Sequence, residues 1–379
     1  MIRIALAGAA AILALAASSA HAASWPAVPA GAELAQQRAA DLAAAERAVA
    51  DARTRWWDAD AQWYTDFLFA PKQGNLARLW SVYPLFEALI GIQVADPSPA
   101  HLAALRALGD TLAPTYWNAS LKPVAGYSWY PHLTSPISGA FFDDSGWLGL
   151  AYVDAFEATH DPAYLVPAHK AFTFIVGAGW DAVGGGGTWW ETAHSYKTIE
   201  PLAAAVLIGA ELYKVRHKKW YLQWVDRLTA WADAHSFNAA RGLYQRSPTD
   251  DTTMDYVQGL MIVADQELCT AAKRPQLCAK ARRLADAAAV AFPPDWFWAP
   301  QYDAVYLRWM LEYSRLTGDP RWSALALTDA QRALTLGRDP GNGLFTHGWD
   351  GRWIADGLEE HAGNAAVLAW GAVAAQPTS

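Results

Sequence analysis

The stretch FFDDSGWLGLAYVDAFEATHDPAYL, residues 141–165, carries the features that decide the fold prediction. Its segment 145–158 is apolar on nearly all sides, as a helix buried on every side should be. Asp143 and Asp144 precede this segment, and the Thr-His-Asp-Pro turn at 159–162 ends it and begins another helix at its Pro. The stretch therefore predicts a buried helix joined by a tight turn to a second helix.

Outside this stretch, the chain repeats the same pattern, and the Thr-x-Asp-Pro turn recurs at 317–320. A 3.6-residue period with helix start and stop signals predicts about twelve helices and no run of alternating strands. The expected spans are 31–67, 76–93, 98–114, 143–159, 162–178, 197–216, 217–235, 252–272, 275–291, 300–317, 320–337 and 357–375.

Short and long connections alternate along the chain, and the long ones mostly lead into the even-numbered helices. Three long loops share a Gly-then-aromatic pattern that predicts short β-hairpins: Gly187-Thr188-Trp189-Trp190, Gly242-Leu243-Tyr244 and Gly343-Leu344-Phe345. In an antiparallel array, all long loops then lie at one end, at the N-termini of one set of helices. The sequence predicts an all-α fold, an (α/α)6 toroid with six inner and six outer helices, and places Asp143 and Asp144 on its loop-rich face.

The N-terminus reads as an export signal. Residues 1–3 supply a positive charge, 4–17 are apolar, and Ala20-His21-Ala22 is typical of a cleavage site. We therefore expect a signal peptide at 1–22 followed by a single catalytic domain at 23–379. No other run is long and apolar enough to span a bilayer, so the prediction is a soluble protein, secreted or periplasmic, without membrane insertion.

Charge and composition indicate the kind of partner. The net charge of −8 argues against nucleic acid or an anionic membrane, since either calls for a basic face. The ten His show no metal-ligand spacing, so no metal and no cofactor are expected. The 21 Trp and 15 Tyr exceed what one core needs, and flat aromatic surfaces in loops suit sugar rings. We expect a monomer that binds a polysaccharide or oligosaccharide.

Cys269 and Cys278 are the only cysteines. In an exported chain a disulfide between them is expected, the alternative being two buried thiols.

The Asp143-Asp144 pair has two interpretations. Acidic residues at a helix N-terminus are stabilised by the helix dipole, so the pair can be explained without a catalytic role. Alternatively, two neighbouring carboxyls in an apolar setting can hold different protonation states, as a glycoside hydrolase requires. Retaining enzymes need carboxyls about 5–5.5 Å apart, a spacing that adjacent residues can meet. As a catalytic pair they predict retention of configuration.

The sequence resembles glycoside hydrolase family 76, the endo-α-1,6-mannanases. The resemblance is carried by 141–165, GWDAVGGGGTWWETAHSYK (179–197), DYVQGLMIVADQEL (255–268) and QYDAVYLRWM (301–310). It implies an (α/α)6 toroid that cleaves α-linked mannan, with Asp143 as nucleophile and Asp144 as general acid/base. The chain departs from the family pattern at Thr198, Val257 and Pro84, where the family usually has amide-bearing segments. Without these amides, hydrogen bonds to sugar hydroxyls are lost, which affects the expected choice of substrate.

Eight further residues are candidates for substrate binding: Trp189, Trp190, His194, Tyr196, Lys197, Tyr256, Gln258 and His347. Of the two adjacent Trp, one is expected to stack on a sugar while the other packs below. For Lys197, the alternatives are a contact to sugar hydroxyls and a structural pair with an acid such as Glu191. Tyr256 and Gln258 stand at the start of the corresponding helix, and the two His lie in loops beside the cleft.

The leading prediction is thus an exported retaining glycosidase for α-linked mannan-like glycans. Two alternatives remain open. Another (α/α)6 sugar enzyme, an inverting hydrolase or a lyase, would place its second acid on a different loop. A glycan-binding protein would keep the aromatic cleft without turnover.

Overall fold

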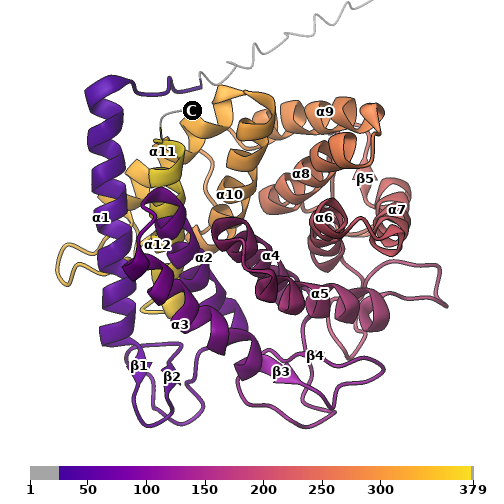
Figure 1. The fold of residues 1–379 in the computed structure, drawn as a ribbon, viewed down its shortest axis with the longest axis horizontal. Helices are drawn as coiled ribbons and strands as arrows, with labels where there is room; N and C mark the ends of the chain where they lie inside the picture. Colours follow the sequence, from indigo (N-terminus) through magenta and orange to yellow (C-terminus); the bar gives the residue numbers. More distant parts are fainter. Residues whose placement is uncertain (1–24, 377–379) are drawn as a thin grey trace, which may run out of the picture.

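The fold is described from a computed structural model over residues 25–376, so the expected signal peptide at 1–22 lies outside the described residues. Over this range the chain forms twelve α-helices (Figure 1). Their bounds are α1 Gly31–Arg55, α2 Leu79–Ala95, α3 Pro99–Tyr116, α4 Phe142–Thr159, α5 Leu165–Phe174, α6 Ile199–Arg216, α7 Lys219–His235, α8 Asp255–Ala271, α9 Pro275–Ala291, α10 Pro300–Thr317, α11 Pro320–Leu336 and α12 Leu358–Ala374.

The even-numbered helices form the inner ring. They contact one another in the order α2, α4, α6, α8, α10, α12, and α12 closes the ring against α2. Helix α6 shows why they are inside, because every residue from Ile199 to Leu212 is buried. A Cβ on Gly91 of α2 would lie 2.8 Å from the Cβ of Ala369, so glycine permits the close approach of α2 and α12. The predicted (α/α)6 toroid is confirmed.

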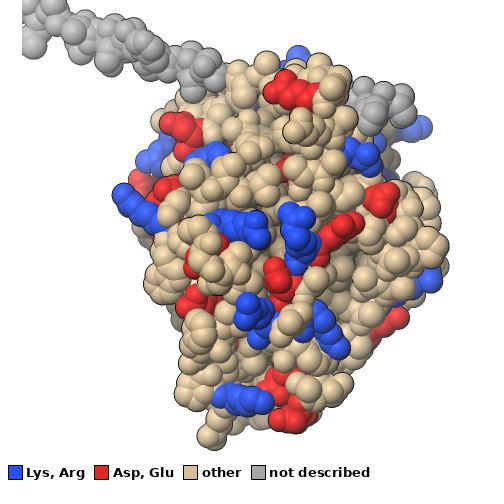
Figure 2. All heavy atoms as spheres, turned by 90° about the vertical axis from the view of Figure 1, so that its left-hand side faces the viewer, with Lys and Arg blue, Asp and Glu red and all other residues tan. Residues whose placement is uncertain are grey.

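The odd-numbered helices are amphipathic and lie outside the ring. In α7 only Tyr221, Val225, Leu228 and Ala232 are buried, a single stripe at helical spacing. Helix α1 lies at one edge of the molecule in Figure 1, and its face turned to solvent carries interspersed acidic and basic side chains (Figure 2). In the part of the chain that is described, no helix has the length and apolar character needed to cross a membrane.

Short hairpins occupy the loops before the inner helices, at positions only partly predicted. The strand pairs are β1 Trp57–Asp58 with β2 Trp63–Tyr64, β3 Trp117–Asn118 with β4 Gly126–Tyr127, and β5 Phe237–Asn238 with β6 Leu243–Tyr244. The last pair confirms the hairpin expected around Gly242. The Gly187 loop forms two isolated bridges, Trp180 to Thr188 and Trp189 to Lys197.

Two expectations about these loops were wrong. The first helix, expected over 31–67, ends at Arg55, because the Asp58 carboxylate accepts the N–H groups of Asp60 and Ala61 and turns the chain into the β1–β2 hairpin. The segment around Gly343 forms no strand pair. The N–H of Gly343 instead donates to the carbonyl of Asp339 in a tight turn.

Both Thr-x-Asp-Pro turns begin the next helix as predicted. Asp319 accepts the N–H of Arg321 and starts α11, and Asp161 accepts that of Ala163. After Asp161, however, the expected helix 162–178 is divided into a 3-10 turn (Pro162–Tyr164), α5 and a π-helical turn (Ile175–Gly179).

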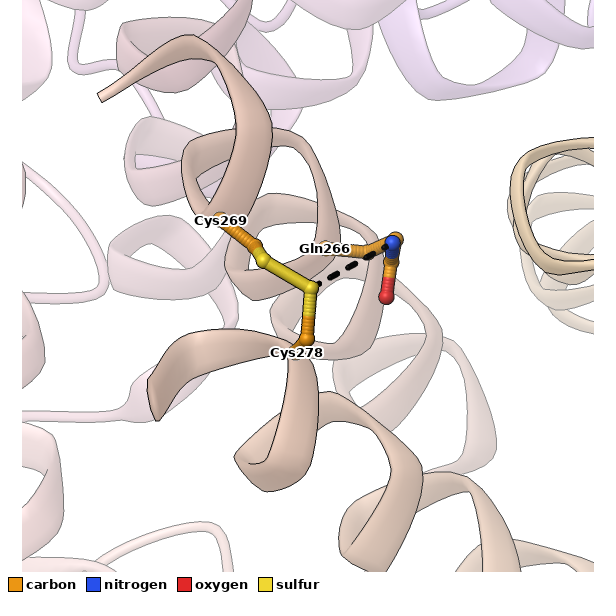
Figure 3. The surroundings of a disulfide bond; sticks show 3 residues. All are labelled: Gln266, Cys269 and Cys278. Carbon is orange, nitrogen blue, oxygen red and sulfur yellow. Dashed lines mark hydrogen bonds between the residues drawn. A yellow bond between two sulfur atoms is a disulfide. The ribbon is translucent and has the colours of Figure 1, made fainter. Parts of the chain in front are cut away.

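Two further contacts fix neighbouring or opposite helices. Cys269 and Cys278 form a disulfide between the end of α8 and α9, with the Gln266 amide beside it (Figure 3). Across the ring, Arg308 of α10 donates to both carboxylate oxygens of Asp154 of α4, a fully buried pair. The Arg308–Asp154 pair holds α4, which carries the Asp143-Asp144 pair near its N-terminus.

Candidate active site

The loop-rich end of the ring contains a cavity of about 600 Å³ whose wall is rich in aromatic residues. It is lined by Arg78, Trp80, Trp129, Ser138, Gly139, Ala140, Phe141, Asp143, Asp144, Trp147, Trp190, Glu191, Thr192, Ala193, Tyr256 and Tyr302. Asp143 and Asp144 occupy the first turn of α4 and face this cavity. The size suits a small number of sugar rings, and the aromatic wall leaves the few polar groups to orient a ligand.

Asp143 is held by two hydrogen bonds. The indole N–H of Trp190 donates to its Oδ2 at 2.8 Å, and the backbone N–H of Asp144 donates to its Oδ1 at 3.0 Å. Burial raises the pKa of Asp143 to about 6, and these two donors oppose that rise because they favour the ionised form. Near neutral pH this carboxyl is therefore the more easily ionised of the two.

Asp144 has a different environment. Its carboxyl accepts no hydrogen bond from any residue between 25 and 376, and burial together with the charge of Asp143 raises its pKa well above the usual range. The guanidinium of Arg78 opposes this effect, and the carboxylate of Glu359 adds to it. The pair can thus hold one proton, with Asp144 as its carrier.

Arg78 and Glu359 connect the carboxyl pair to the ends of α2 and α12. Arg78 donates to Asp66 at 2.6 Å, and its Nη2 lies 3.6 Å from Glu359. Glu359 also accepts the indole N–H of Trp80 at 2.5 Å and the amide of Gln301 at 2.9 Å. Glu359 thereby fixes the ring of Trp80 in the cavity wall.

The aromatic wall is a continuous set of stacked and edge contacts. Trp80 lies 5.2 Å from Tyr302 and 5.7 Å from Trp147, and Tyr302 stacks on Tyr256 at 5.7 Å. Trp298, next to Tyr302 at 5.2 Å, extends the set outward and is 40% exposed. Such packed rings form a preorganised surface for the C–H face of a sugar.

Of the predicted binding residues, Trp190 and Tyr256 lie in the cavity wall with the carboxyl pair. The two adjacent Trp separate as expected, because Trp189 points away and stacks on His194 at 5.1 Å. Lys197 is beside Trp189 and pairs with Asp181 at 2.7 Å, a structural pair with a different acid from the Glu191 considered above.

The remaining three candidates lie outside the cavity lining. Tyr196 packs on the outer side of Trp190 at 5.0 Å. The amide of Gln258 is fully buried and bonds to both backbone groups of Tyr244, where it anchors β6 to α8. His347 forms a bridge with Trp353 in the loop before α12. A sequence pattern that puts a polar residue at an inner-helix start does not reveal which way its side chain points.

The positions that depart from the family pattern also lie away from the cavity lining. Thr198 is buried at the start of α6, Val257 is buried in α8, and Pro84 is buried inside α2. Several cavity residues lacked a signal that sequence reasoning could use, in particular Arg78, Trp80 and Trp129. Trp147 and Tyr302 stood in segments that carry the family resemblance, yet nothing in their spacing marked them as cavity residues.

Comparisons with known proteins agree with this architecture. The sequence profile of glycosyl hydrolase family 76 matches residues 43–305. A comparison with curated proteins gives no significant match.

Three solved structures share the fold at low sequence identity. A family 76 alpha-mannanase from Bacteroides thetaiotaomicron is 17% identical, with a TM-score of 0.77 over 88% of this chain and 95% of that one. An inactive variant of an alpha-1,6-mannanase from a Salegentibacter species, in complex with alpha-1,6-mannotriose, is 15% identical, with a TM-score of 0.69 over 88% and 99%. A cellobiose 2-epimerase from Spirochaeta thermophila is 15% identical, with a TM-score of 0.60 over 90% and 97%.

At such identities the structural matches establish the fold alone. The profile match covers more than half of the chain and includes the helix that carries the carboxyl pair. The chain therefore belongs to glycosyl hydrolase family 76 and is a glycoside hydrolase.

Proposed function

We propose that this chain is an exported, retaining glycosidase that cleaves α-1,6-linked mannan-like glycans through Asp143 and Asp144. The observation that carries the proposal is the unequal environment of the two adjacent carboxyls. Asp143 accepts two hydrogen bonds and its pKa is about 6, whereas burial and the charge of Asp143 keep Asp144 protonated. Environments that separate two pKa values in this way assign the acid and the base.

In the first step, Asp143 attacks the anomeric carbon from the face opposite the α-linked leaving group. Asp144 gives its proton to the departing glycosidic oxygen, and a β-linked glycosyl-enzyme forms on Asp143. In the second step, Asp144 accepts a proton from water as that water attacks the same carbon. The second inversion restores the α configuration, and the proton on Asp144 is regained.

The mannan substrate is supported by the relatives. The Salegentibacter alpha-1,6-mannanase was made inactive by replacing two consecutive Asp residues with Asn, and it holds alpha-1,6-mannotriose. Here too, a consecutive Asp pair lies in an aromatic cavity, and the family departures fall outside that cavity. A substrate of the same linkage class is the one that these features favour.

The test measures release of reducing sugar from unbranched α-1,6-mannan by the wild-type chain and by an Asp143→Asn/Asp144→Asn double variant. Release by the wild type alone supports the proposal. Equal release by both would remove the carboxyl pair from the reaction, and binding without release would favour the glycan-binding alternative. Export is tested separately, by sequencing the N-terminus of the secreted or periplasmic protein, which we expect to begin at Ala23.

A further inference from the structure

A second aromatic cavity lies on the outside of the ring, between α3 and α5. This α3–α5 groove has a volume of about 420 Å³. Its lining includes Asp110, Trp117, Tyr127, Tyr152, Tyr164 and Lys170. None of these residues lines the active-site cavity, so the groove is a separate feature of the described structure.

The floor of the groove is fixed by hydrogen bonds from its tyrosines. The hydroxyl of Tyr152 accepts the N–H of Ala113 at 2.9 Å and donates to the carbonyl of Gly109 at 2.5 Å, so it is inserted into a turn of α3. The hydroxyl of Tyr127 donates to the carbonyl of Pro167 on α5 at 3.4 Å. These hydrogen bonds fix the two tyrosine rings in the floor of the groove, one against α3 and the other against α5.

The groove also holds polar groups that lack partners. Tyr164 is 4% exposed, and its hydroxyl makes no hydrogen bond of standard geometry among residues 25–376; the Arg106 side chain is close enough to act on it as a donor, and the charge of Asp110 is nearby. In α3, Pro114 has no N–H, so the carbonyl of Asp110 lacks its helical donor. A buried polar group without a partner is costly, and a ligand with hydroxyl groups would supply one.

The rim of the groove combines an aromatic ring with charges of both signs. The amine of Lys170 lies 4.3 Å from the ring centroid of Trp117, and Asp110 stands on the other side, on α3. Because the rim carries charges of both signs, it does not select an anionic or a cationic ligand, whereas the ring of Trp117 favours a ligand with an apolar face. A neutral ligand that has both hydroxyls and a C–H face, which is a sugar, fits this lining.

One loop joins the groove to the active site. It begins at Trp117 in the groove and ends at Phe141 in the active-site cavity. Next to Trp117, the buried amide of Asn118 lies within 3.2 Å of the hydroxyls of Ser128 and Ser138, and Ser138 also lines the active-site cavity. The same loop therefore contributes residues to both the groove and the active-site cavity.

We propose that the α3–α5 groove is a second, noncatalytic binding site for a segment of the same neutral glycan polymer that the active site cleaves. The proposal rests on the proposed function for the identity of the polymer. A polymer held in the groove keeps its neighbouring segments at high effective concentration near the active site, so polymer binding gains while cleavage of short substrates does not.

The experiment compares Trp117→Ala and Tyr164→Phe with the unchanged chain, using unbranched α-1,6-mannan and α-1,6-mannotriose as probes. Tyr164→Phe removes only the buried hydroxyl and preserves the ring, so it tests the groove without leaving a cavity in the fold. Trp220→Ala, which removes an outer-helix Trp of 39% exposure outside the groove, is the matched control. Binding to mannan is measured by gel retardation in the Asp143→Asn/Asp144→Asn background, and turnover is measured in the active chain.

We expect Trp117→Ala to weaken retardation by mannan and to raise KM for the polymer by roughly fivefold or more, the loss typical of a Trp that anchors a ligand. Tyr164→Phe should act in the same direction, and neither variant should change kcat/KM for mannotriose. Retardation equal to that of the unchanged chain in both groove variants, or an equal loss in Trp220→Ala, would overturn the proposal. Turnover of mannotriose reports on the proposed function alone, so the two can fail separately.

Discussion

The indole N–H of Trp190 donates to Oδ2 of Asp143 at 2.8 Å. Trp190 lies in the loop that leads into α6, so this loop influences the pKa of a carboxyl group on α4. Trp190 is itself packed between Phe141 at 4.8 Å and Tyr196 at 5.0 Å. The donor therefore has little freedom to turn away, and Asp143 keeps this hydrogen bond before any substrate arrives. Preorganisation of this kind favours the ionised nucleophile that the proposed reaction needs.

Replacing Trp190 with Phe removes this donor and keeps an aromatic ring in the wall. The pKa of Asp143 is about 6, so the acidic limb of kcat/KM for the wild type should lie near pH 6. Without the donor the ionised form is less favoured, and the limb should move up by about one pH unit. Trp189→Phe, which changes a ring that stacks on His194, is the control and should leave the limb in place. An unmoved limb in Trp190→Phe would contradict this role.

Glu359→Gln tests the basic limb of the same profile. The negative charge of Glu359 raises the pKa of Asp144, and burial raises the pKa of Glu359 itself to about 7, so above that pH its charge is present. Gln removes the charge and can still accept the N–H of Trp80. The pKa of Asp144 should fall, and the basic limb of kcat/KM should move to lower pH. A basic limb at the wild-type position would show that Glu359 has only a structural role.

Asp144→Ala should separate the two steps of the reaction. Substrates with ordinary leaving groups should lose about 10²–10⁴-fold in rate, because no acid protonates the departing oxygen. An aryl α-mannoside with an activated leaving group should still form the glycosyl-enzyme, and azide should speed its breakdown to give an α-mannosyl azide. In Asp143→Ala, which lacks the nucleophile and is the comparison, azide can only displace the aryl group directly, so any azide product should be the β-mannosyl azide. An α-mannosyl azide from both variants alike would exclude the assigned roles.

Asp41→Asn should stabilise the fold at alkaline pH. Asp41 of α1 is fully buried, and neither carboxylate oxygen accepts a hydrogen bond of standard geometry within the described residues. Burial raises its pKa to about 7, and the nearby Gln37 amide opposes that rise. The folded-state pKa is above the unfolded value of about 4, so this group's contribution to stability is present below pH 4 and is lost as pH rises to about 7. The free energy of unfolding of Asp41→Asn at pH 8 should exceed that of wild type by roughly 1 kcal/mol or more, and the gain should shrink at pH 5.

Thermal or urea unfolding at the two pH values measures this difference. Asp295→Asn, at an exposed acid, is the control and should behave as wild type at both. A gain in Asp41→Asn that is the same at pH 5 and pH 8 would show that ionisation of Asp41 is not its cause.

The fold was predictable because helical period and connection length are local properties of the chain. The buried run at 145–158 and the Asp-Pro turns both identify helices and their ends, and alternation of loop lengths then assigns them to two rings. The end of α1 was missed because residues 56–67 contain no Gly or Pro to mark the end of a helix. The hydrogen bonds from the N–H groups of Asp60 and Ala61 to Asp58, which form the turn, are visible only in three dimensions.

The candidate site was predictable where its residues are adjacent in sequence, and not where they meet across the ring. Asp143 and Asp144 are neighbours, and Trp190 follows a recognisable glycine-rich loop. Arg78 and Glu359 lie at opposite ends of the chain and meet only because α12 closes the ring against α2. Gln258 has the polarity of a ligand-binding residue, but its buried amide is used by the backbone of Tyr244.

The measurement that tests the central claim most directly is the anomeric configuration of the first product. Proton NMR during cleavage of α-1,6-mannan, recorded before mutarotation, distinguishes α from β reducing ends. A double displacement through Asp143 predicts that the α-anomer appears first and the β-anomer grows only with mutarotation. If the β-anomer appears first, water attacks directly, and the account of Asp143 as nucleophile and Asp144 as its acid/base partner is wrong.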